Sequence, residues 1–241
     1  MPSADAQPSD PIEGSVSFTR SIRYLVDPPP VTAPPAPLLT ALHGQGMSAE
    51  RFRRVLRHLP PTGHARLFPD GPYVFEMRDP PQIRAGHGWY IYLGDSDGFR
   101  RELEQTETHL LTTLDHIEAE QGTTDRARSV LLGFSQGGYL AGFVGLRHPE
   151  RFGGVVISAA RLKHEFLVDE LARGGSALPA VLLLHSPDDP ATAFARAEES
   201  RDLLAEAGAD VELFSHEGGH RLPPAALARV HAWLDERGLS S

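Results

Sequence analysis

The segment Gly133–Gly137 reads G-F-S-Q-G, which places Ser135 between glycines in the pattern G-x-S-x-G. An apolar, β-prone run precedes it at residues 129–132, and residues 138–143 suit the start of a helix. A sharp turn from strand into helix holds one side chain out at the carboxyl edge of a sheet, on strained backbone. Glycines flank such a turn because it leaves no room for a Cβ atom. Ser135 is therefore a candidate nucleophile.

A serine hydroxyl needs a base to take its proton, and the base needs a group that orients it. On a parallel sheet these groups come from loops at the carboxyl ends of the strands. Asp188 and Asp189 directly follow a predicted buried strand at residues 181–184. Neighbouring side chains in an extended turn point in different directions, so only one of the two can face a histidine. We expect this acid to be Asp189, partly because Pro190 fixes the direction in which the chain leaves it.

The candidate base is His220, in the loop after a last predicted strand that carries Val211 and Leu213. Gly218 and Gly219 allow this loop to bend back over the serine. The resulting chain order is Ser135, Asp189, His220. That order is expected of α/β-hydrolases and differs from the other serine-protease arrangements.

Catalysis at Ser135 also requires donors for the oxyanion of a tetrahedral intermediate. The first candidate is the backbone N–H of Gln136, the residue after the nucleophile. The second is the N–H of Gln45, in the loop after a predicted strand at residues 38–42, where glycines at 44 and 46 permit close approach of a substrate. Each such donor typically contributes about 10²–10³ in rate.

These motifs together resemble the phospholipase/carboxylesterase family of α/β-hydrolases, which includes acyl-protein thioesterases. The matching segments are Leu42–Gly46, Gly133–Gly138, Asp189-Pro190 and Gly219-His220, within residues 38–235. The resemblance implies a compact, cofactor-free esterase or thioesterase with a Ser-His-Asp triad. Its partner would be a small-molecule ester or thioester substrate.

Three other functions fit parts of the pattern. The same fold supports peptide, lactone or dienelactone cleavage, and a hydrolase-like chain can also serve as a non-catalytic binding protein. Residues 216–220 read H-E-G-G-H, which matches the zinc motif H-E-x-x-H. That motif works only on a helix, and two glycines cost a helix roughly 2 kcal/mol relative to alanines. We therefore assign no metal and expect His216 to be a surface loop residue.

Three residues are candidates for the substrate pocket. Trp89 and Tyr90 lie in residues 73–98, which we expect to be irregular and aromatic, near the functional edge of the sheet. Core packing is an equally good explanation of both. Leu162, in the loop after a predicted strand at residues 155–158, is the third candidate.

Short strands alternate with helical patterns along the chain, and the inner strands are continuous apolar runs. This arrangement predicts an α/β-hydrolase fold, with a mostly parallel central sheet, helices on both faces and no large cap domain. A long helix is expected at about residues 99–121. Residues 1–13, rich in Pro, Ser and Asp, read as a disordered tail, and residues 14–241 as a single domain.

Bulk composition narrows the choice of partners. The 241 residues contain 23 Lys and Arg against 32 Asp and Glu, a formal net charge of −9, which disfavours nucleic acid as a partner. The absence of cysteine excludes disulfides, Cys-based zinc sites and a thiol nucleophile. No apolar stretch is long enough for a membrane span, and the N-terminus lacks the apolar region of a signal peptide. We expect a cytoplasmic protein, and the sequence leaves its oligomeric state open.

Overall fold

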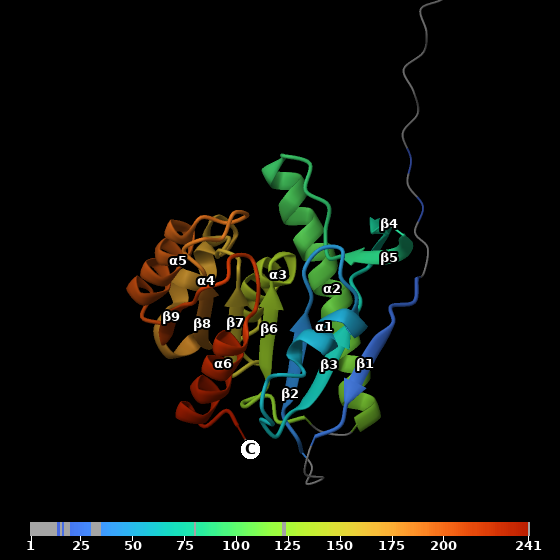
Figure 1. The fold of residues 1–241 in the computed structure, drawn as a ribbon. Helices are drawn as coiled ribbons and strands as arrows, with labels where there is room; N and C mark the ends of the chain where they lie inside the picture. The colour runs from blue at the N-terminus through green and yellow to red at the C-terminus, as the bar shows by residue number, and fades with distance from the viewer. Residues whose placement is uncertain are drawn as a thin grey trace, which may run out of the picture.

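The computed structural model describes residues 14, 16, 20–29, 35–79, 81–121 and 124–240, so the predicted tail at residues 1–13 lies outside the described residues. A seven-stranded sheet runs through the middle of this part of the chain (Figure 1). In spatial order its strands are β1 (Tyr24–Asp27), β3 (Ala65–Pro69), β2 (Leu38–Leu42), β6 (Val130–Phe134), β7 (Gly154–Ser158), β8 (Ala180–His185) and β9 (Val211–Ser215). Only β1, at the edge, pairs antiparallel with its neighbour. The predicted mostly parallel sheet is confirmed.

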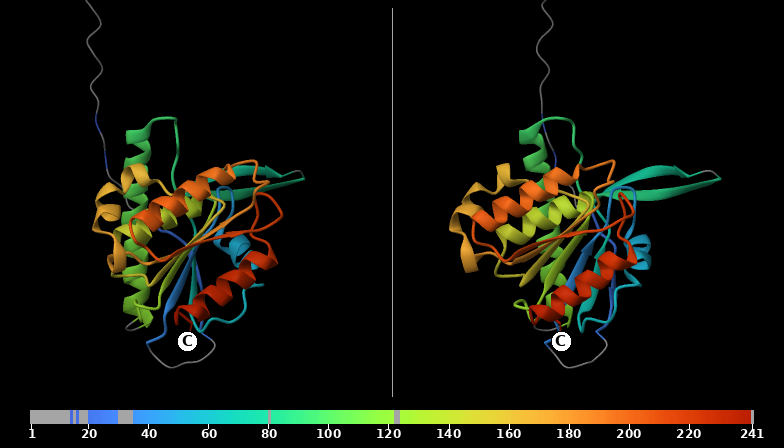
Figure 2. Two further views of the ribbon diagram at one scale, coloured as in Figure 1. Left: turned by 90° about the vertical axis from the view of Figure 1, so that its left-hand side faces the viewer. Right: turned by 60° about the vertical axis from the view of Figure 1, so that its left-hand side comes forward.

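Two layers of helices bury the two faces of this sheet (Figure 2). One face is covered by α1 (Ala49–Leu56) and α6 (Pro224–Glu236), and the other by α2 (Ser96–Gln121), α3 (Gln136–Arg147), α4 (Val168–Arg173) and α5 (Phe194–Glu206). Successive strand residues point to opposite faces. Accordingly Leu131 packs in the core under α2 and α3, whereas Leu132 packs in the core under α1 and α6. Continuous apolar strands are needed because both faces are buried.

The segment between β3 and α2 differs from the expectation of irregular structure. It forms an antiparallel hairpin of β4 (Tyr73–Asp79) and β5 (Gln82–Gly88), which projects from the body of the protein (Figure 2). The period-2 signal was present, because Tyr73, Phe75 and Met77 alternate with residues that are more exposed or polar. In the sequence the signal is weakened by Val74, an apolar residue at an exposed position of β4, and by Gly86 and Gly88 in β5. The helix α2 follows from Ser96, three residues before the predicted start.

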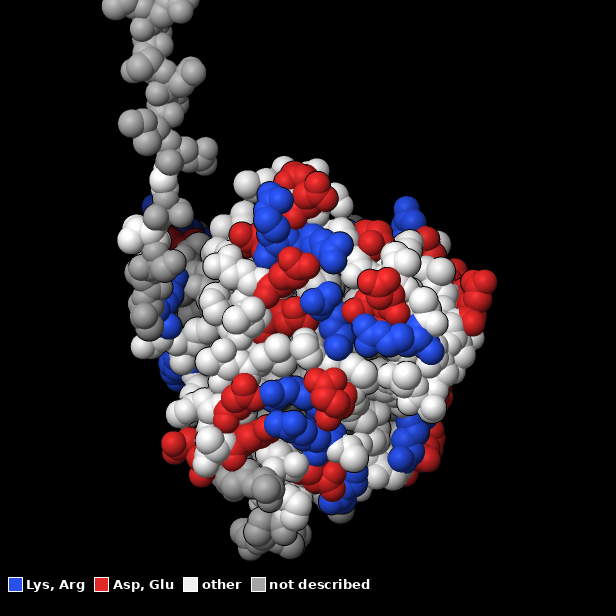
Figure 3. All heavy atoms as spheres, turned by 180° about the vertical axis from the view of Figure 1, so that it is seen from behind, with Lys and Arg blue, Asp and Glu red and all other residues white. Residues whose placement is uncertain are grey.

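Two short 3₁₀ helices, η1 (His164–Phe166) and η2 (Gly175–Ala177), flank α4 between β7 and β8. No helix in the described part of the chain is long and apolar enough to cross a membrane. On the face opposite to that of Figure 1, acidic and basic side chains are intermingled, with no large area of one sign (Figure 3). Oppositely charged side chains also pair elsewhere at short distances, as Arg126 does with Glu118 at 2.5 Å.

Candidate active site

Ser135 occupies the turn between the central strand β6 and the helix α3. Its backbone has φ 53° and ψ −119°, a left-handed conformation that is strained for a residue with a side chain. The turn is tight: a Cβ atom on Gly133 would lie 2.0 Å from the carbonyl oxygen of Gly137, and one on Gly137 would lie 2.2 Å from that of Leu42. Both glycines are therefore required by close backbone approach, and the turn presents the Ser135 hydroxyl at the carboxyl edge of the sheet.

The structure brings Asp189 and His220 to this same edge. Asp189 lies in the loop after β8, and His220 in the loop after β9, the next strand in the sheet. The His220 Nε2 atom lies 2.8 Å from the Ser135 Oγ atom. The His220 Nδ1 atom lies 2.8 Å and 3.0 Å from the two carboxylate oxygens of Asp189. A continuous chain of hydrogen bonds thus joins residues that are far apart in the sequence.

This pattern also assigns the proton on the imidazole ring. A carboxylate only accepts hydrogen bonds, so Nδ1 of His220 carries the hydrogen and donates to Asp189. Nε2 is then the acceptor for the hydroxyl proton of Ser135. The ring is in the tautomer that a general base requires.

Asp189 is held as an anion by several donors. Its side chain is fully buried, and the backbone N–H groups of Ala191 and Thr192 donate to its Oδ1 atom at 2.8 and 3.1 Å. Burial alone would raise the pKa of this carboxyl. The hydrogen bonds from His220 and the two N–H groups outweigh burial and lower the pKa of Asp189 below its ordinary value. The orienting group therefore stays charged and fixed at neutral pH.

Ser186 links the two loops, and the sequence analysis did not identify it. Its Oγ atom accepts hydrogen bonds from the backbone N–H of Gly219 at 3.1 Å and of Asp188 at 3.3 Å. It thus holds the loop of His220 against the loop of Asp189. The available signal was a serine placed directly at the end of β8, in the same loop as the aspartates.

The two residues predicted as oxyanion donors lie beside the serine. Gln45 and Gln136 both line a cavity of about 550 Å³ together with Ser135 and His220. Gln136 is the first residue of α3, and the first N–H groups of a helix have no acceptor within the helix. The positive end of the helix dipole adds to the attraction for an anion at this point. Gln45 reaches the cavity from the loop between β2 and α1.

His43 anchors the loop that carries Gln45. Its ring is fully buried, with Nδ1 2.8 Å from the carbonyl oxygen of Gly44 and Nε2 accepting the N–H of Gly71 at 3.0 Å. Burial lowers the pKa of His43 to about 4, so the ring is neutral at pH 7. A neutral ring with its hydrogen on Nδ1 satisfies both contacts. His43 is therefore a structural residue of this loop.

Aromatic and aliphatic side chains form most of the remaining cavity wall. Tyr90 is among them, together with residues of β4 and of the segment after β5: Tyr73, Val74, Phe75, Ile91, Tyr92, and Tyr139 of α3. Ala191 and Thr192 complete the lining. The hairpin that the sequence analysis missed thus supplies one side of the site.

Two of the three predicted pocket residues do not line this cavity. Trp89 is 2% exposed, and its indole N–H donates to the carbonyl oxygen of His43 at 2.7 Å, behind the cavity wall. Leu162 is 1% exposed and packs in the core next to α3 and α5, where its backbone N–H donates to Ser200. Neither residue lines this cavity, because apolar residues near the functional edge can equally pack inward.

Residues 216–220 form a loop between β9 and α6, so the H-E-x-x-H pattern does not present its two histidines on one helix face. His216 was expected at the surface but is only 6% exposed. Its backbone N–H donates to the carbonyl oxygen of His185 at 3.0 Å, which extends the pairing of β9 with β8 and draws the side chain inward. Burial lowers the pKa of His216 below its ordinary value.

Comparison with known proteins identifies the family of this chain. A family model described as phospholipase/carboxylesterase matches residues 30–237. The chain belongs to this family. The family consists largely of carboxylic ester hydrolases, and the resemblance inferred from the motifs is confirmed. No relative was found among curated protein sequences.

Solved structures share the fold at low sequence identity. The carboxylesterase of Bacillus cereus is 19% identical, with a TM-score of 0.70 over 90% of this chain and 94% of that one. Esterase PE8 is 24% identical, with a TM-score of 0.73 over 89% and 98% of the two chains. Acyl-protein thioesterase 2 of Zea mays is 18% identical, with a TM-score of 0.71 over 89% and 98%. At these identities the likeness establishes the fold alone.

Proposed function

We propose that this protein is a serine hydrolase that cleaves carboxylic esters or thioesters. The observation that carries the proposal is the unbroken hydrogen-bonded chain from Asp189 through His220 to Ser135. Ser135 and His220 line a cavity large enough for a small ester. Each of the three residues is held in place separately. Ser135 lies in a strained turn, Asp189 accepts from backbone N–H groups, and His220 lies in a loop that Ser186 holds. Such preorganisation is typical of a site that performs chemistry.

In the first half of the reaction the Ser135 oxygen attacks the carbonyl carbon, and its proton passes to Nε2 of His220. Asp189 stabilises the imidazolium that forms. The carbonyl π electrons move onto oxygen, and the N–H groups of Gln136 and Gln45 stabilise this oxyanion. The intermediate collapses, the carbon–oxygen or carbon–sulfur bond to the leaving group breaks, and His220 protonates that group. An acyl-enzyme remains on Ser135.

In the second half a water molecule takes the place of the leaving group. His220 removes a proton from the water as its oxygen attacks the acyl carbon, and the same two N–H groups again stabilise the oxyanion. The bond to Ser135 then breaks, and the serine oxygen recovers its proton from His220. The free enzyme is restored, and no cofactor takes part in these steps.

Replacement of the nucleophile tests the assignment. We expect Ser135→Ala to reduce the hydrolysis of p-nitrophenyl butyrate by about 10⁴-fold or more, because a triad acts as a unit. Ser176→Ala, at an exposed position of η2, should leave turnover unchanged. Wild-type protein should react with a fluorophosphonate probe, and Ser135→Ala should not. Full turnover in a folded Ser135→Ala protein would refute the proposal, and a wild-type protein that neither reacts nor hydrolyses would support a non-catalytic role.

A panel of substrates separates the possible reactions of this site. Short esters and acyl thioesters should be cleaved more efficiently than lactones and amino-acid amides at equal concentration. A preference for amides would instead support a peptidase, and a preference for lactones or dienelactones would support the corresponding ring-opening hydrolase. The measured quantity is kcat/KM for each class.

A further inference from the structure

The two proposed oxyanion donors belong to segments that are separate in the sequence, a loop for Gln45 and the first turn of α3 for Gln136. Gln45 follows β2, and Gln136 follows β6. Main-chain pairing of these strands ends at Leu42 and Gly133, before either donor is reached. An oxyanion hole works only when both donors lie about 2.7–3.1 Å from one point, and a misplacement of 1 Å can cost about 10²-fold in rate. Some contact beyond the strand pairing must therefore hold the two loops in register.

One side of that contact lies between Gln136 and the segment after β5. The side-chain Oε1 atom of Gln136 accepts the backbone N–H of Trp89 at 2.9 Å, and its Nε2 atom donates to the carbonyl oxygen of Tyr90 at 2.8 Å. Both bonds are buried. The amide of Gln136 thus pairs with the backbone at two points, which fixes the first residue of α3 relative to Trp89.

The other side lies between Trp89 and the loop of Gln45. The indole N–H of Trp89 donates to the carbonyl oxygen of His43 at 2.7 Å, and the two ring centroids are 4.9 Å apart. His43 is two residues before Gln45 and is itself fixed by Gly44 and Gly71. A shift of the indole would therefore move the backbone that leads to the donor.

Trp89 is itself held firmly in place. Its carbonyl oxygen accepts the hydroxyl of Thr106 on α2, and its side chain is packed in the core formed under α2 and α3. All three of its hydrogen-bonding groups are used, and each contacts a different element. A residue with this set of contacts is a rigid link between α2, the start of α3 and the loop after β2.

We propose that Trp89 is a positioning residue that keeps the N–H groups of Gln45 and Gln136 at the spacing that an oxyanion requires. It acts through Gln136 on one side and His43 on the other, and it does not touch the substrate. This inference rests on the proposed function, because the spacing matters only if an oxyanion forms at Ser135.

The substitution Trp89→Phe removes the indole N–H and keeps an aromatic ring in the core. We expect kcat to fall by about 10–100-fold, which is no more than the effect of deleting one oxyanion donor. KM should stay within about threefold of the wild-type value. The affinity for a trifluoromethyl ketone, which forms a tetrahedral adduct with Ser135, should fall by the same factor as kcat. The apparent pKa of the pH profile of kcat/KM should not change, because His220 keeps its contacts.

Trp233→Phe is the matched control, because the chain contains two tryptophans. Trp233 lies in α6 with its side chain fully buried in the core against the sheet, and its indole nitrogen has no hydrogen-bond partner in the described structure. Its replacement should leave kcat and the affinity for the trifluoromethyl ketone within about twofold of the wild-type values. If Trp89→Phe does not fold, Thr106→Val, which removes the donor to the Trp89 carbonyl, carries the test with an expected fall in kcat of about threefold or more.

Wild-type protein provides a second readout. The two tryptophans should give two indole N–H signals in nuclear magnetic resonance spectra. Formation of a phosphonyl adduct at Ser135 should shift the signal of Trp89 and leave that of Trp233 in place. An unchanged kcat in folded Trp89→Phe or Thr106→Val, or a raised KM with unchanged kcat, would overturn the positioning role while Ser135-dependent hydrolysis still stood. Absence of Ser135-dependent hydrolysis in the wild type would overturn both proposals.

Discussion

Two aspartates that are neighbours in the sequence differ completely in their surroundings. Asp189 is buried and bonded to His220 and to two backbone N–H groups, whereas Asp188 is exposed. The reason is local: the N–H of Asp188 bonds to Ser186, and the chain then turns so that the next side chain faces inward. At the scale of the residue, position within one turn decides which carboxylate meets the base.

This difference predicts unequal effects of the same substitution. Asp189→Asn should lower kcat/KM for p-nitrophenyl butyrate by about 10³–10⁴-fold, because an amide cannot stabilise the imidazolium and favours the wrong tautomer of His220. Asp188→Asn should change kcat/KM for the same ester by less than about twofold. Steady-state kinetics on both variants would decide the matter, and similar losses in the two would contradict the assignment of Asp189.

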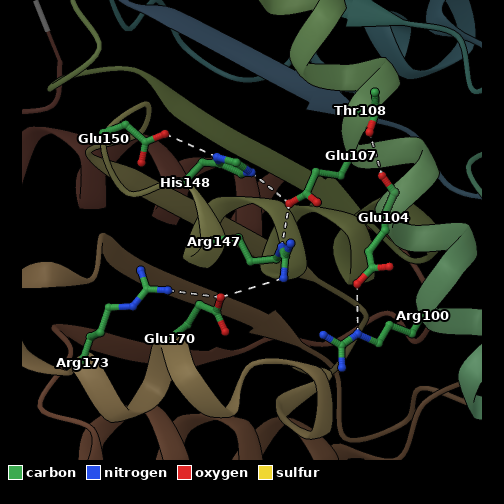
Figure 4. Close-up of polar contacts among 9 residues, drawn as sticks. All are labelled: Arg100, Glu104, Glu107, Thr108, Arg147, His148, Glu150, Glu170 and Arg173. Atoms are coloured by element: carbon green, nitrogen blue, oxygen red, sulfur yellow. Dashed lines mark hydrogen bonds and ion pairs between the residues drawn. The ribbon is translucent and has the colours of Figure 1, made fainter.

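At the scale of elements, a polar network joins α2, α3 and α4 (Figure 4). Glu107 of α2 is 6% exposed and accepts from Nε of Arg147 at 2.8 Å, with Nε2 of His148 at 2.9 Å. Arg147 also approaches Glu170 of α4 at 3.9 Å. The hydrogen bond with Glu107 is the largest cause that raises the pKa of His148. The network therefore ties α3, the helix that follows Ser135, to its neighbours.

We expect Glu107→Gln to lower the free energy of unfolding by about 1–3 kcal/mol, since it leaves partly buried cations without their anion. Glu104→Gln is the control on the same helix. Glu104 pairs with Arg100 at 3.0 Å, but both side chains are at least 40% exposed, so its loss should cost less than about 0.5 kcal/mol. Urea denaturation of both variants measures the difference, and equal costs would contradict the role given to the network.

The loss of unfolding free energy caused by Glu107→Gln should also depend on pH. His148 has a higher pKa in the folded protein than the ordinary value of 6.5, so its pairing with Glu107 stabilises the fold fully below pH 6.5 and is lost as pH rises through the folded pKa. The destabilisation should thus be larger at pH 6 than at pH 9, where only the contact with Arg147 remains. If the loss of unfolding free energy became larger as the pH rises, this contribution of His148 would be excluded.

At the scale of the whole molecule, charge limits the choice of substrate. The chain has a formal net charge of −9, and none of the described residues that line the cavity is Asp, Glu, Lys or Arg. A substrate with a carboxylate would meet a repulsive field and would lose solvation in the cavity without a cation to pair with. If the proposed function holds, we therefore expect a preference for uncharged esters over esters that carry a carboxylate.

A pair of substrates of equal length tests this selectivity. The kcat/KM of p-nitrophenyl hexanoate should exceed that of the mono-p-nitrophenyl ester of adipic acid by about tenfold or more, a difference of about 1.4 kcal/mol. Added salt should reduce the difference in kcat/KM between the two esters, because salt screens the net charge of the protein. Equal efficiencies at low salt would show that the charge of the cavity and its surroundings does not select the substrate.

The strands, the parallel sheet and the candidate triad could be predicted because they depend on local signals. Apolar runs mark buried strands, G-x-S-x-G marks a tight turn, and parallel strands bring the loops that follow them to one edge. The order of these loops along the chain then indicates Ser135, Asp189 and His220 as the candidate triad. Their catalytic role stays a prediction, which the experiments above test. The hairpin β4–β5 was missed although its alternation is local, because apolar Val74 blurs the pattern in β4 and two glycines interrupt it in β5.

Sequence alone determined which residues could react and in what order they stand along the chain. Only the tertiary structure decided that Tyr90 faces the cavity while Trp89, next to it, is buried, that Leu162 packs into the core, and that Ser186 joins two loops. These outcomes depend on hydrogen bonds and packing between segments tens of residues apart. An apolar side chain has the same driving force to leave water wherever it is buried, so its type does not reveal which neighbours will cover it.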